Sequence, residues 1–446
     1  MLKNRPLLKN TLLLTAASLL LRAVGLLFQS FISDALGAAG VGLFALTMSA
    51  SGLAITFAVG GVRYAVTRVV AEEAAKGGQR GGYAVRAAIA YAAVFSAVAA
   101  IALYFGADYI ARAWVKDTRV SMALKVMAAA LPLYALTSVF EGYFVAAGQV
   151  YKGVASQVAE EVVMFAAAFY LVPRVTGGIA QSCAAIVSAH LLGNAASLIL
   201  CAVLYTRKHA ARAQPADRGR AEFRAVGKRL IAVALPIAGS AYVRTGLSTL
   251  QHMLIPAGLR SSGLGAEAAL AAHGVIHGMV FPVLLFPGVL ITAAAELLIP
   301  ELTAAQMSGN VSRVRRVVGR ITREAFAFSL AAASAMFVFG PLIGELMFQS
   351  AEAGEYIRLL SPLVLVMYMD MITDGMLKGL GEQLYAMYVN IIDSAVSVIL
   401  VWLTLPIWGI NAYLFMIVAT ELMNFILSAA KLRQRSSVQR RIAVHP

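Results

Sequence analysis

The stretch TLLLTAASLLLRAVGLLFQSF, residues 11–31, decides the fold class. Its length and apolar composition suit a helix that crosses a membrane, because about 20 apolar residues span the hydrocarbon core. Arg22 stands at its centre, where an arginine costs roughly 2.5–3.5 kcal/mol on insertion scales. Such a residue predicts either an internal acid as its partner or a hydrated cavity beside the helix.

The composition extends this reading to the whole chain. Of its 446 residues 60% are hydrophobic and only 13% are charged, which is too little charge to cover the surface of a soluble protein. Apolar runs of membrane-spanning length recur from end to end, and we predict twelve spans. Their approximate limits are 12–32, 43–66, 86–106, 121–146, 155–173, 179–205, 230–254, 268–299, 324–348, 357–379, 385–405 and 408–430.

The predicted fold is an all-α integral membrane protein of about 12 transmembrane helices in two pseudo-symmetric six-helix bundles. The N-terminal bundle takes residues 1–206 and the C-terminal bundle residues 230–432. Between them, residues 207–229 form a basic cytoplasmic linker, and residues 433–446 form a basic cytoplasmic tail.

The basic residues indicate the orientation. When the connections are numbered alternately, 27 lysines and arginines fall on one side of the membrane and 6 on the other. By the positive-inside rule both termini are cytoplasmic. The net charge of +15 therefore indicates topology and contact with lipid headgroups. Membrane lipids are expected partners, and nucleic acid is not.

Two ungapped matches relate the halves. At an offset of 222, Ser18, Arg22 and Gln29 correspond to Ser240, Arg244 and Gln251. At an offset of 233, a second set of five residues recurs: Glu141, Gly142, Gly148, Glu160 and Pro173 correspond to Asp374, Gly375, Gly381, Asp393 and Pro406. Since each half has an even number of spans, the halves share one orientation, as in transporters built from parallel repeats.

The first and seventh spans each carry a polar face at helical spacing. These faces comprise Thr11, Thr15, Ser18, Arg22, Gly25 and Gln29 in one span, and Pro236, Ser240, Arg244, Ser248 and Gln251 in the other. They predict a cationic cavity lined by Ser18, Arg22, Gln29, Ser240, Arg244 and Gln251, with Arg63 as a third arginine. Arginine suits bidentate binding of phosphate or carboxylate.

The alternative is that each arginine pairs with a buried acid. Eight acids lie in or near spans: Glu141, Glu160, Glu161, Glu296, Asp370, Asp374, Asp393 and Glu421. Glu141 and Asp374 recur at the same place in both halves, which favours a structural role for them.

Two residues are candidates for ion or proton coupling. Glu296 lies within the apolar segment AAAELLIPEL, and His277 ends an H-x-x-x-H pattern that starts at His273. A metalloprotease motif needs Glu after its first His, but Gly274 stands there, so His277 is a candidate polar lining residue or proton carrier. Cys183 and Cys201 form no ligand pattern and are expected to pack as small apolar residues. We therefore expect no metal site and no cofactor beyond a coupling Na⁺ or H⁺. With no catalytic motif and no segment long enough for a nucleotide-binding domain, we do not expect an enzyme.

Four segments resemble the MOP superfamily, in particular its sporulation-type polysaccharide exporters, and more distantly its lipid II flippases and MATE exporters. They are LLRAVGLLFQSFISDALGAAGVGLFAL (20–46), GVRYAVTRVVAEEAAKGG (61–78), GMVFPVLLFPGVLITAAAELLIPELTAAQMSGNVSRVRRVV (278–318) and LKGLGEQLYAMYVN (377–390). The resemblance implies alternating access in the bacterial cytoplasmic membrane. It also implies a lipid-linked glycan of the undecaprenyl-pyrophosphate type as substrate, with glycosyltransferases or polymerases of the same pathway as partners. Lipid II flippases often carry an arginine six residues after the first, but Phe28 stands there.

Three functions follow as hypotheses. The first is a flippase for a lipid-linked oligosaccharide or cell-wall precursor, in which Arg22 and Arg244 hold the phosphates and Arg63 helps. The second is a MATE-like exporter of small cationic compounds driven by Na⁺ or H⁺, which needs a carboxylate in the cavity. The third is a factor for envelope or spore-cortex assembly that transports nothing.

Overall fold

The computed structural model describes residues 5–75, 81–209, 219–307 and 311–442. These residues are almost entirely helical, and no strand occurs among them. The predicted all-α membrane fold is confirmed. The principal helices are α1 (Arg5–Val59), α2 (Val62–Ala75), α3 (Gly81–Tyr109), α4 (Ser121–Ala146), α5 (Val150–Leu171), α6 (Ile179–His209), α7 (Gly219–Ser261), α8 (Ala266–His273), α9 (Phe281–Leu285), α10 (Gly288–Met307), α11 (Val311–Phe348), α12 (Ala351–Gly379), α13 (Gln383–Trp408) and α14 (Ile410–Ile442).

Short segments of other helix types complete the chain. The π-helices are η1 (Ile110–Val115) and η5 (Gly274–Val280), and the 3₁₀ turns are η2 (Thr118–Val120) and η3 (Val172–Arg174). Within the described residues, twelve helical stretches are long and apolar enough to cross a membrane. A helix satisfies its own backbone hydrogen bonds, which is why apolar segments of this length adopt it in lipid.

The structure adds three details to the predicted spans. The predicted connection between 12–32 and 43–66 is a kink within α1 where two helices meet, and Gly37 alone lies outside helical geometry there, at φ 66° and ψ 174°. The predicted eighth span, 268–299, is interrupted by a turn between α9 and α10. The second span is interrupted in the same way between α1 and α2, at Gly60 and Gly61. The second predicted span of each half is therefore divided, between α1 and α2 in the first half and between α9 and α10 in the second.

Contacts between the helices divide the chain into two compact units. Unit 1 comprises Met1–Leu21 and Leu43–Thr249, and unit 2 comprises Arg22–Gly42 and Leu250–Pro446. These limits differ from the predicted bundles, because part of α1 packs with unit 2 and most of α7 packs with unit 1. The predicted linker is helical where it is described, since α6 ends at His209 and α7 begins at Gly219. Residues 210–218 of the linker and 443–446 of the tail lie outside the described residues.

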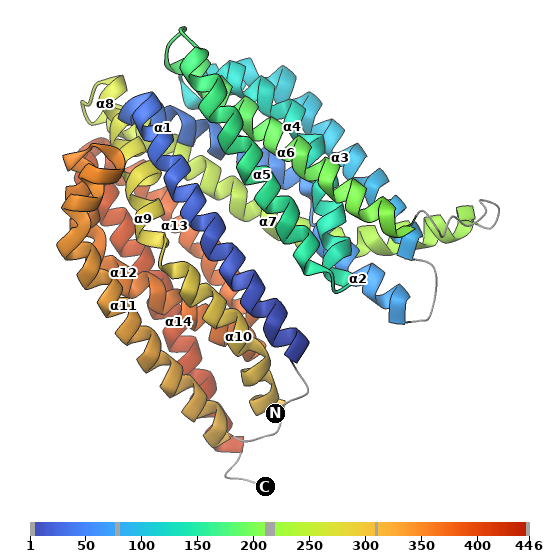
Figure 1. Cartoon of the computed structure of the whole chain (residues 1–446). Helices are drawn as coiled ribbons and strands as arrows, with labels where there is room; N and C mark the ends of the chain where they lie inside the picture. Colours follow the sequence, from blue (N-terminus) through green and yellow to red (C-terminus); the bar gives the residue numbers. More distant parts are fainter. Residues whose placement is uncertain (1–4, 76–80, 210–218, 308–310, 443–446) are drawn as a thin grey trace. The chain divides into compact units, whose positions relative to one another are not determined.

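Both units use the same packing order (Figure 1). In unit 1, α4 packs against α2, α3 and α6, and α5 packs on α6. In unit 2, α12 packs against α10, α11 and α14, and α13 packs on α14. The correspondence of α4 with α12 and of α5 with α13 is the one that the offset of 233 predicts.

The repeated turns have matching hydrogen bonds. After α4, the backbone N–H of Gln149 donates to the carbonyl of Phe144 at 2.8 Å, and Gly148 has φ 67°. After α12, the N–H of Glu382 donates to the carbonyl of Leu377 at 2.9 Å, and Gly381 has φ 79°. Glycine tolerates this left-handed conformation at a helix C-terminus without a Cβ clash. The sequence repeat is therefore a repeat of backbone geometry.

Candidate functional site

The first polar face lies on α1. Ser18 and Arg22 are exposed, and Gln29 is half-buried. The Nε2 atom of Gln29 lies 3.3 Å from the position that a Cβ of Gly278 would take, so Gln29 faces η5 within unit 2. Among the described residues no acid forms an ion pair with Arg22. The side chains of Thr11 and Thr15 lie outside the described part of the chain.

The second polar face lies on α7. Arg244 is exposed, and no acid in the described ranges pairs with it. Ser240 is half-buried and donates its hydroxyl to the carbonyl of Ile237 at 2.9 Å. Gln251 donates Nε2 to the sulfur of Met416 at 3.7 Å. Arg22 belongs to unit 2 and Arg244 to unit 1, so a cavity shared by the two stays a prediction.

Arg63 has a protein partner. Its guanidinium lies 3.2 Å from the Glu141 carboxylate, and the side chain of Glu141 is only 11% exposed. Gln157 donates Nε2 to the other carboxylate oxygen of Glu141 at 2.9 Å. The pairing of an in-membrane arginine with an internal acid, which the sequence left open as an alternative, is thus realised at Arg63. The Arg63 side chain remains 45% exposed, so a role toward substrate stays a prediction.

Unit 2 repeats the acid but not the arginine. Asn390 donates Nδ2 to Asp374 at 3.5 Å, as Gln157 does to Glu141. The residue that corresponds to Arg63 at the offset of 233 is Glu296, and it is exposed. The packing agrees, because Gly375 contacts Ala295 much as Gly142 contacts Arg63. In unit 1 the acid Glu141 is paired with Arg63. In unit 2 the position of Arg63 is taken by a further acid, Glu296.

Four carboxyl groups of unit 2 come together from three helices: Asp370, Asp374, Asp393 and Glu421. Glu421 lies close enough to the three aspartates to interact with them electrostatically. Asp370 is 7% exposed, and among the described residues one oxygen of each aspartate has no hydrogen-bond partner. In the same part of the structure no lysine or arginine forms an ion pair with any of the four. Lys378 interacts electrostatically with Asp370 and Asp374 without forming an ion pair with either, so the negative charge of the group is only partly balanced.

Sequence reasoning named these acids singly and missed the group. A signal was present, because Asp370 and Asp374 are four residues apart and therefore share a helix face. Another candidate for coupling, His277, lies beside two further histidines, His252 and His273, and beside Phe281. Its ring centroid lies 4.1 Å from that of His252.

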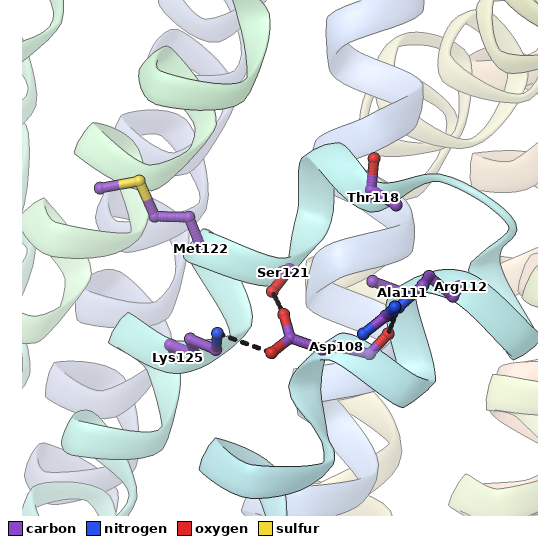
Figure 2. A pocket seen from close by; sticks show the side chains of 7 residues that line it. All are labelled: Asp108, Ala111, Arg112, Thr118, Ser121, Met122 and Lys125. Carbon is purple, nitrogen blue, oxygen red and sulfur yellow. Dashed lines mark hydrogen bonds and ion pairs between the residues drawn. The ribbon is translucent and has the colours of Figure 1, made fainter.

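A pocket of about 470 Å³ lies in unit 1 between the end of α3 and the start of α4 (Figure 2). Its lining residues are Asp108, Ala111, Arg112, Thr118, Ser121, Met122 and Lys125. Figure 2 shows Asp108 between two partners, the hydroxyl of Ser121 and the ammonium of Lys125, which lies 2.8 Å away. Asp108 already has protein partners on α4, so these contacts link the end of α3 to the start of α4. The pocket contains none of the predicted site residues.

Comparison with known proteins decides the family. Residues 7–262, more than half of the chain, match the sequence profile described as "Polysaccharide biosynthesis protein". The chain belongs to this polysaccharide biosynthesis protein family. Residues 259–403 of the chain match a second sequence profile, MatE. The predicted membership of the MOP superfamily is confirmed, and the protein is a multi-pass membrane transporter.

This polysaccharide biosynthesis family member has two curated relatives in Bacillus subtilis (strain 168). It is 25% identical to stage V sporulation protein B over 434 residues, covering 95% of this chain and 83% of the relative. It is 23% identical to sporulation protein YkvU over 388 residues, covering 86% of this chain and 84% of the relative. The resemblance to sporulation-type members therefore extends over almost the whole chain.

Solved structures show the same fold. An inward-facing multidrug resistance MATE family transporter of the MOP superfamily matches with a TM-score of 0.72 at 16% identity, over 95% of this chain and 96% of that one. A MOP superfamily transporter from Pyrococcus furiosus matches with a TM-score of 0.64 at 17% identity, over 96% of each chain. At 16–17% identity these matches show only that the folds are alike.

Proposed function

We propose that the protein moves a lipid-linked oligosaccharide or cell-wall precursor of the undecaprenyl-pyrophosphate type across the bacterial cytoplasmic membrane by alternating access. The observation that carries the proposal is the pair of arginines at equivalent places in the repeat. Arg22 and Arg244 have no acid partner among the described residues, whereas Arg63 has one. An arginine within a membrane span is costly unless an anion meets it, and a pyrophosphate offers oxygens in the geometry that a guanidinium binds.

Binding to the purified full-length protein in lipid nanodiscs tests this proposal. Undecaprenyl pyrophosphate is compared with undecaprenol, which has the same tail and no phosphate. Each charge-assisted hydrogen bond is worth roughly 1.5–3 kcal/mol, so the pyrophosphate is expected to bind at least about 100-fold more tightly. Equal affinity for the two lipids would remove the arginines' role in the proposal.

A coupling cation is part of the same proposal. The four acids of unit 2, namely Asp370, Asp374, Asp393 and Glu421, form no ion pair with a lysine or arginine within the described residues, so we propose Na⁺ or H⁺ as the coupling ion there. Glu296, in the place of Arg63, adds to the negative charge of this unit. The lipid-linked substrate would come from glycosyltransferases of the same pathway, and a polymerase would use the exported product.

A second candidate function rests on the same acids. Residues 259–403 match the MatE profile, and three of the four acids, Asp370, Asp374 and Asp393, lie in this part of the chain. Export of small cationic compounds driven by Na⁺ or H⁺ is therefore the alternative. Efflux of a fluorescent organic cation from proteoliposomes, lost in Asp374→Asn, would favour it over the flippase.

The orientation is tested separately. In a background with Cys183→Ala and Cys201→Ala, Thr118→Cys is expected to react with an impermeant maleimide added outside intact cells. Tyr151→Cys is expected to react only after the cells are permeabilised. Both positions are exposed in the structure, so the two variants differ in the predicted side of the membrane and not in burial. The reverse pattern would contradict cytoplasmic termini.

A further inference from the structure

Helix α11 of unit 2 is longer than a membrane requires. Its 38 residues extend for about 57 Å, because an α-helix rises about 1.5 Å per residue. Residues 325–344 contain no charged side chain, and their length of about 30 Å matches the hydrocarbon core of a bilayer. Residues 311–324, which come before them, therefore project about 21 Å beyond the core on one side. Figure 1 shows α11 as a long helix beside α12.

Three arginines of this projecting part lie on one face of the helix. Arg316, Arg320 and Arg323 are spaced by four and three residues, which is the spacing of neighbours on a helix surface. All three are exposed, and we call them the arginine stripe. The same face continues at five further exposed positions, namely Ala327, Leu330, Ser334, Phe337 and Pro341.

The continuation of this face is an exposed apolar surface. Leu330 is 49% exposed and Phe337 is 46% exposed, whereas the side of α11 that carries Ala325, Ser329 and Ala333 is buried. An exposed apolar surface that is as long as the hydrocarbon core is thick fits contact with lipid. The arginine stripe stands where this surface ends, about 3 to 14 Å before residue 325 along the helix axis. This is the level of the lipid headgroups and of the water next to them.

The contacts of the stripe within the protein leave most of its donors available. The Nε atoms of Arg316 and Arg323 each donate to a backbone carbonyl one turn earlier, at 3.4 Å. Within the described residues neither guanidinium forms an ion pair with an acid. The Nε atom of Arg320 lies 2.8 Å from the carboxylate of Glu324, and an exposed ion pair of this kind contributes little to stability. A guanidinium has five N–H donors, so each arginine can still bind an external anion.

The surroundings of the stripe keep a surplus of positive charge. Residues 311–324 hold five arginines and one acid, Glu324. A second acid, Glu301 of α10, lies near enough to Arg320 to interact with it electrostatically. Five arginines against these two acids leave a surplus of three positive charges. Basic segments beside a membrane attract anionic lipids, and the attraction falls off within a Debye length.

The corresponding helix of unit 1 has no such stripe in its described range. Helix α3 packs against α4 as α11 packs against α12, and Arg86 is the one basic residue within Gly81–Tyr109. Arg86 is exposed, and its face continues through Ala90 to the exposed apolar residue Val94. Both helices have the same predicted orientation, so a single arginine on α3 is enough to mark its side of the membrane. The additional arginines of α11 therefore call for a separate explanation.

We propose that the arginine stripe binds the headgroups of anionic phospholipids in the leaflet beside it, which the predicted orientation makes the cytoplasmic one. Guanidinium groups bind phosphate oxygens through paired, charge-assisted hydrogen bonds. A zwitterionic headgroup carries an ammonium group that offsets its phosphate, whereas an anionic headgroup does not. The surplus of positive charge therefore selects the anionic class. The proposal concerns the outer face of α11 and holds for whatever substrate the protein moves.

Quenching of a single tryptophan by brominated lipids measures which lipid lies next to the stripe. The three natural tryptophans are replaced by phenylalanine, and Ala327→Trp places the reporter one turn after Arg323 on the same face. The full-length protein is reconstituted in bilayers of phosphatidylcholine and phosphatidylglycerol, with the bromine on one lipid or the other. Each basic residue near a membrane surface is worth about fivefold in binding, so the surplus of three predicts a preference for phosphatidylglycerol of about tenfold or more.

A reporter on α3 is the matched control. Ala90→Trp lies four residues after Arg86, as Ala327→Trp lies four residues after Arg323, and both positions are exposed. With a single arginine beside it, the α3 reporter is expected to show a preference of about fivefold or less. A preference at the α11 reporter that is no larger than the one at the α3 reporter would overturn the proposal.

Substitution of the stripe tests the role of its charge. Arg316→Gln, Arg320→Gln and Arg323→Gln together remove three positive charges, which is the whole surplus, so the preference at the α11 reporter is expected to disappear. The three corresponding lysine substitutions keep the charge and are expected to retain most of the preference. A preference that survives the glutamine substitutions, or one that is lost equally in the lysine variant, would contradict a surface that selects lipids by charge.

Discussion

A variant with Arg22→Ala and Arg244→Ala is expected to lose translocation of a pyrophosphate-linked lipid by about 100-fold or more. Each arginine contributes charge-assisted hydrogen bonds worth roughly 1.5–3 kcal/mol, and the two together correspond to at least two powers of ten. Translocation is measured in proteoliposomes as the rate at which a fluorescent lipid-linked sugar becomes inaccessible to an impermeant quencher. The single variants are each expected to lose about tenfold or more.

Two further variants separate recognition from stability. Arg22→Lys with Arg244→Lys keeps both charges but loses the bidentate geometry, so an intermediate rate is expected. Arg63→Ala with Glu141→Gln removes an ion pair of 3.2 Å together with its charge, and it is expected to lower thermal stability more than the translocation rate per folded molecule. Wild-type translocation in the double alanine variant would refute the assignment of Arg22 and Arg244 to the substrate.

The second large effect is expected at Gly42, where α1 meets the η5 region within unit 2. A Cβ there would overlap the backbone carbonyl of Leu270 and lie 3.3 Å from the nitrogen of Gly274. Backbone atoms cannot move aside as a flexible side chain can. Gly42→Leu is therefore expected to cost 1–3 kcal/mol or more, the range typical of overpacking, which is a large part of a stability of about 5–15 kcal/mol.

Gly25→Leu is the matched control on the same helix. No atom lies within 4 Å of a Cβ at Gly25, so the same substitution meets open space. Both changes improve helix propensity by about 1 kcal/mol, and only the contact differs. Thermal unfolding of the detergent-purified proteins is expected to show a large loss for Gly42→Leu and none for Gly25→Leu. Equal midpoints would mean that α1 is not held at this contact.

The sequence was sufficient for the fold class, the number of spans and the repeat, because these depend on the length and order of apolar runs. Gly148 and Gly381, which correspond in the sequence repeat, lie in turns with the same backbone hydrogen-bond pattern. The abruptness of the turn between the first two spans was not predictable in this way. Two helices meet at a kink where Gly37 alone has non-helical backbone angles, and hydropathy is insensitive to the backbone angles of one residue.

The site was predictable in part. The periodicity of α1 and α7 identified Arg22 and Arg244, and the alternative of internal pairing correctly described Arg63. The proximity of His252, His273 and His277 was missed because His252 is 21 residues from His273 in the sequence. Only the packing of α7 beside η5 brings them together. The ion pair between Arg63 and Glu141 in unit 1 likewise depends on a contact between helices, and no corresponding ion pair forms at Asp374 among the described residues of unit 2.

The account's central claim is that the protein carries an anionic lipid-linked glycan across the membrane. The most direct measurement is translocation by the purified wild-type protein alone in proteoliposomes, with a fluorescent undecaprenyl-pyrophosphate sugar and a fluorescent organic cation compared under the same Na⁺ and H⁺ gradients. The account predicts protein-dependent transfer of the lipid-linked sugar and none of the cation. Transfer of the cation with no transfer of the sugar would contradict it.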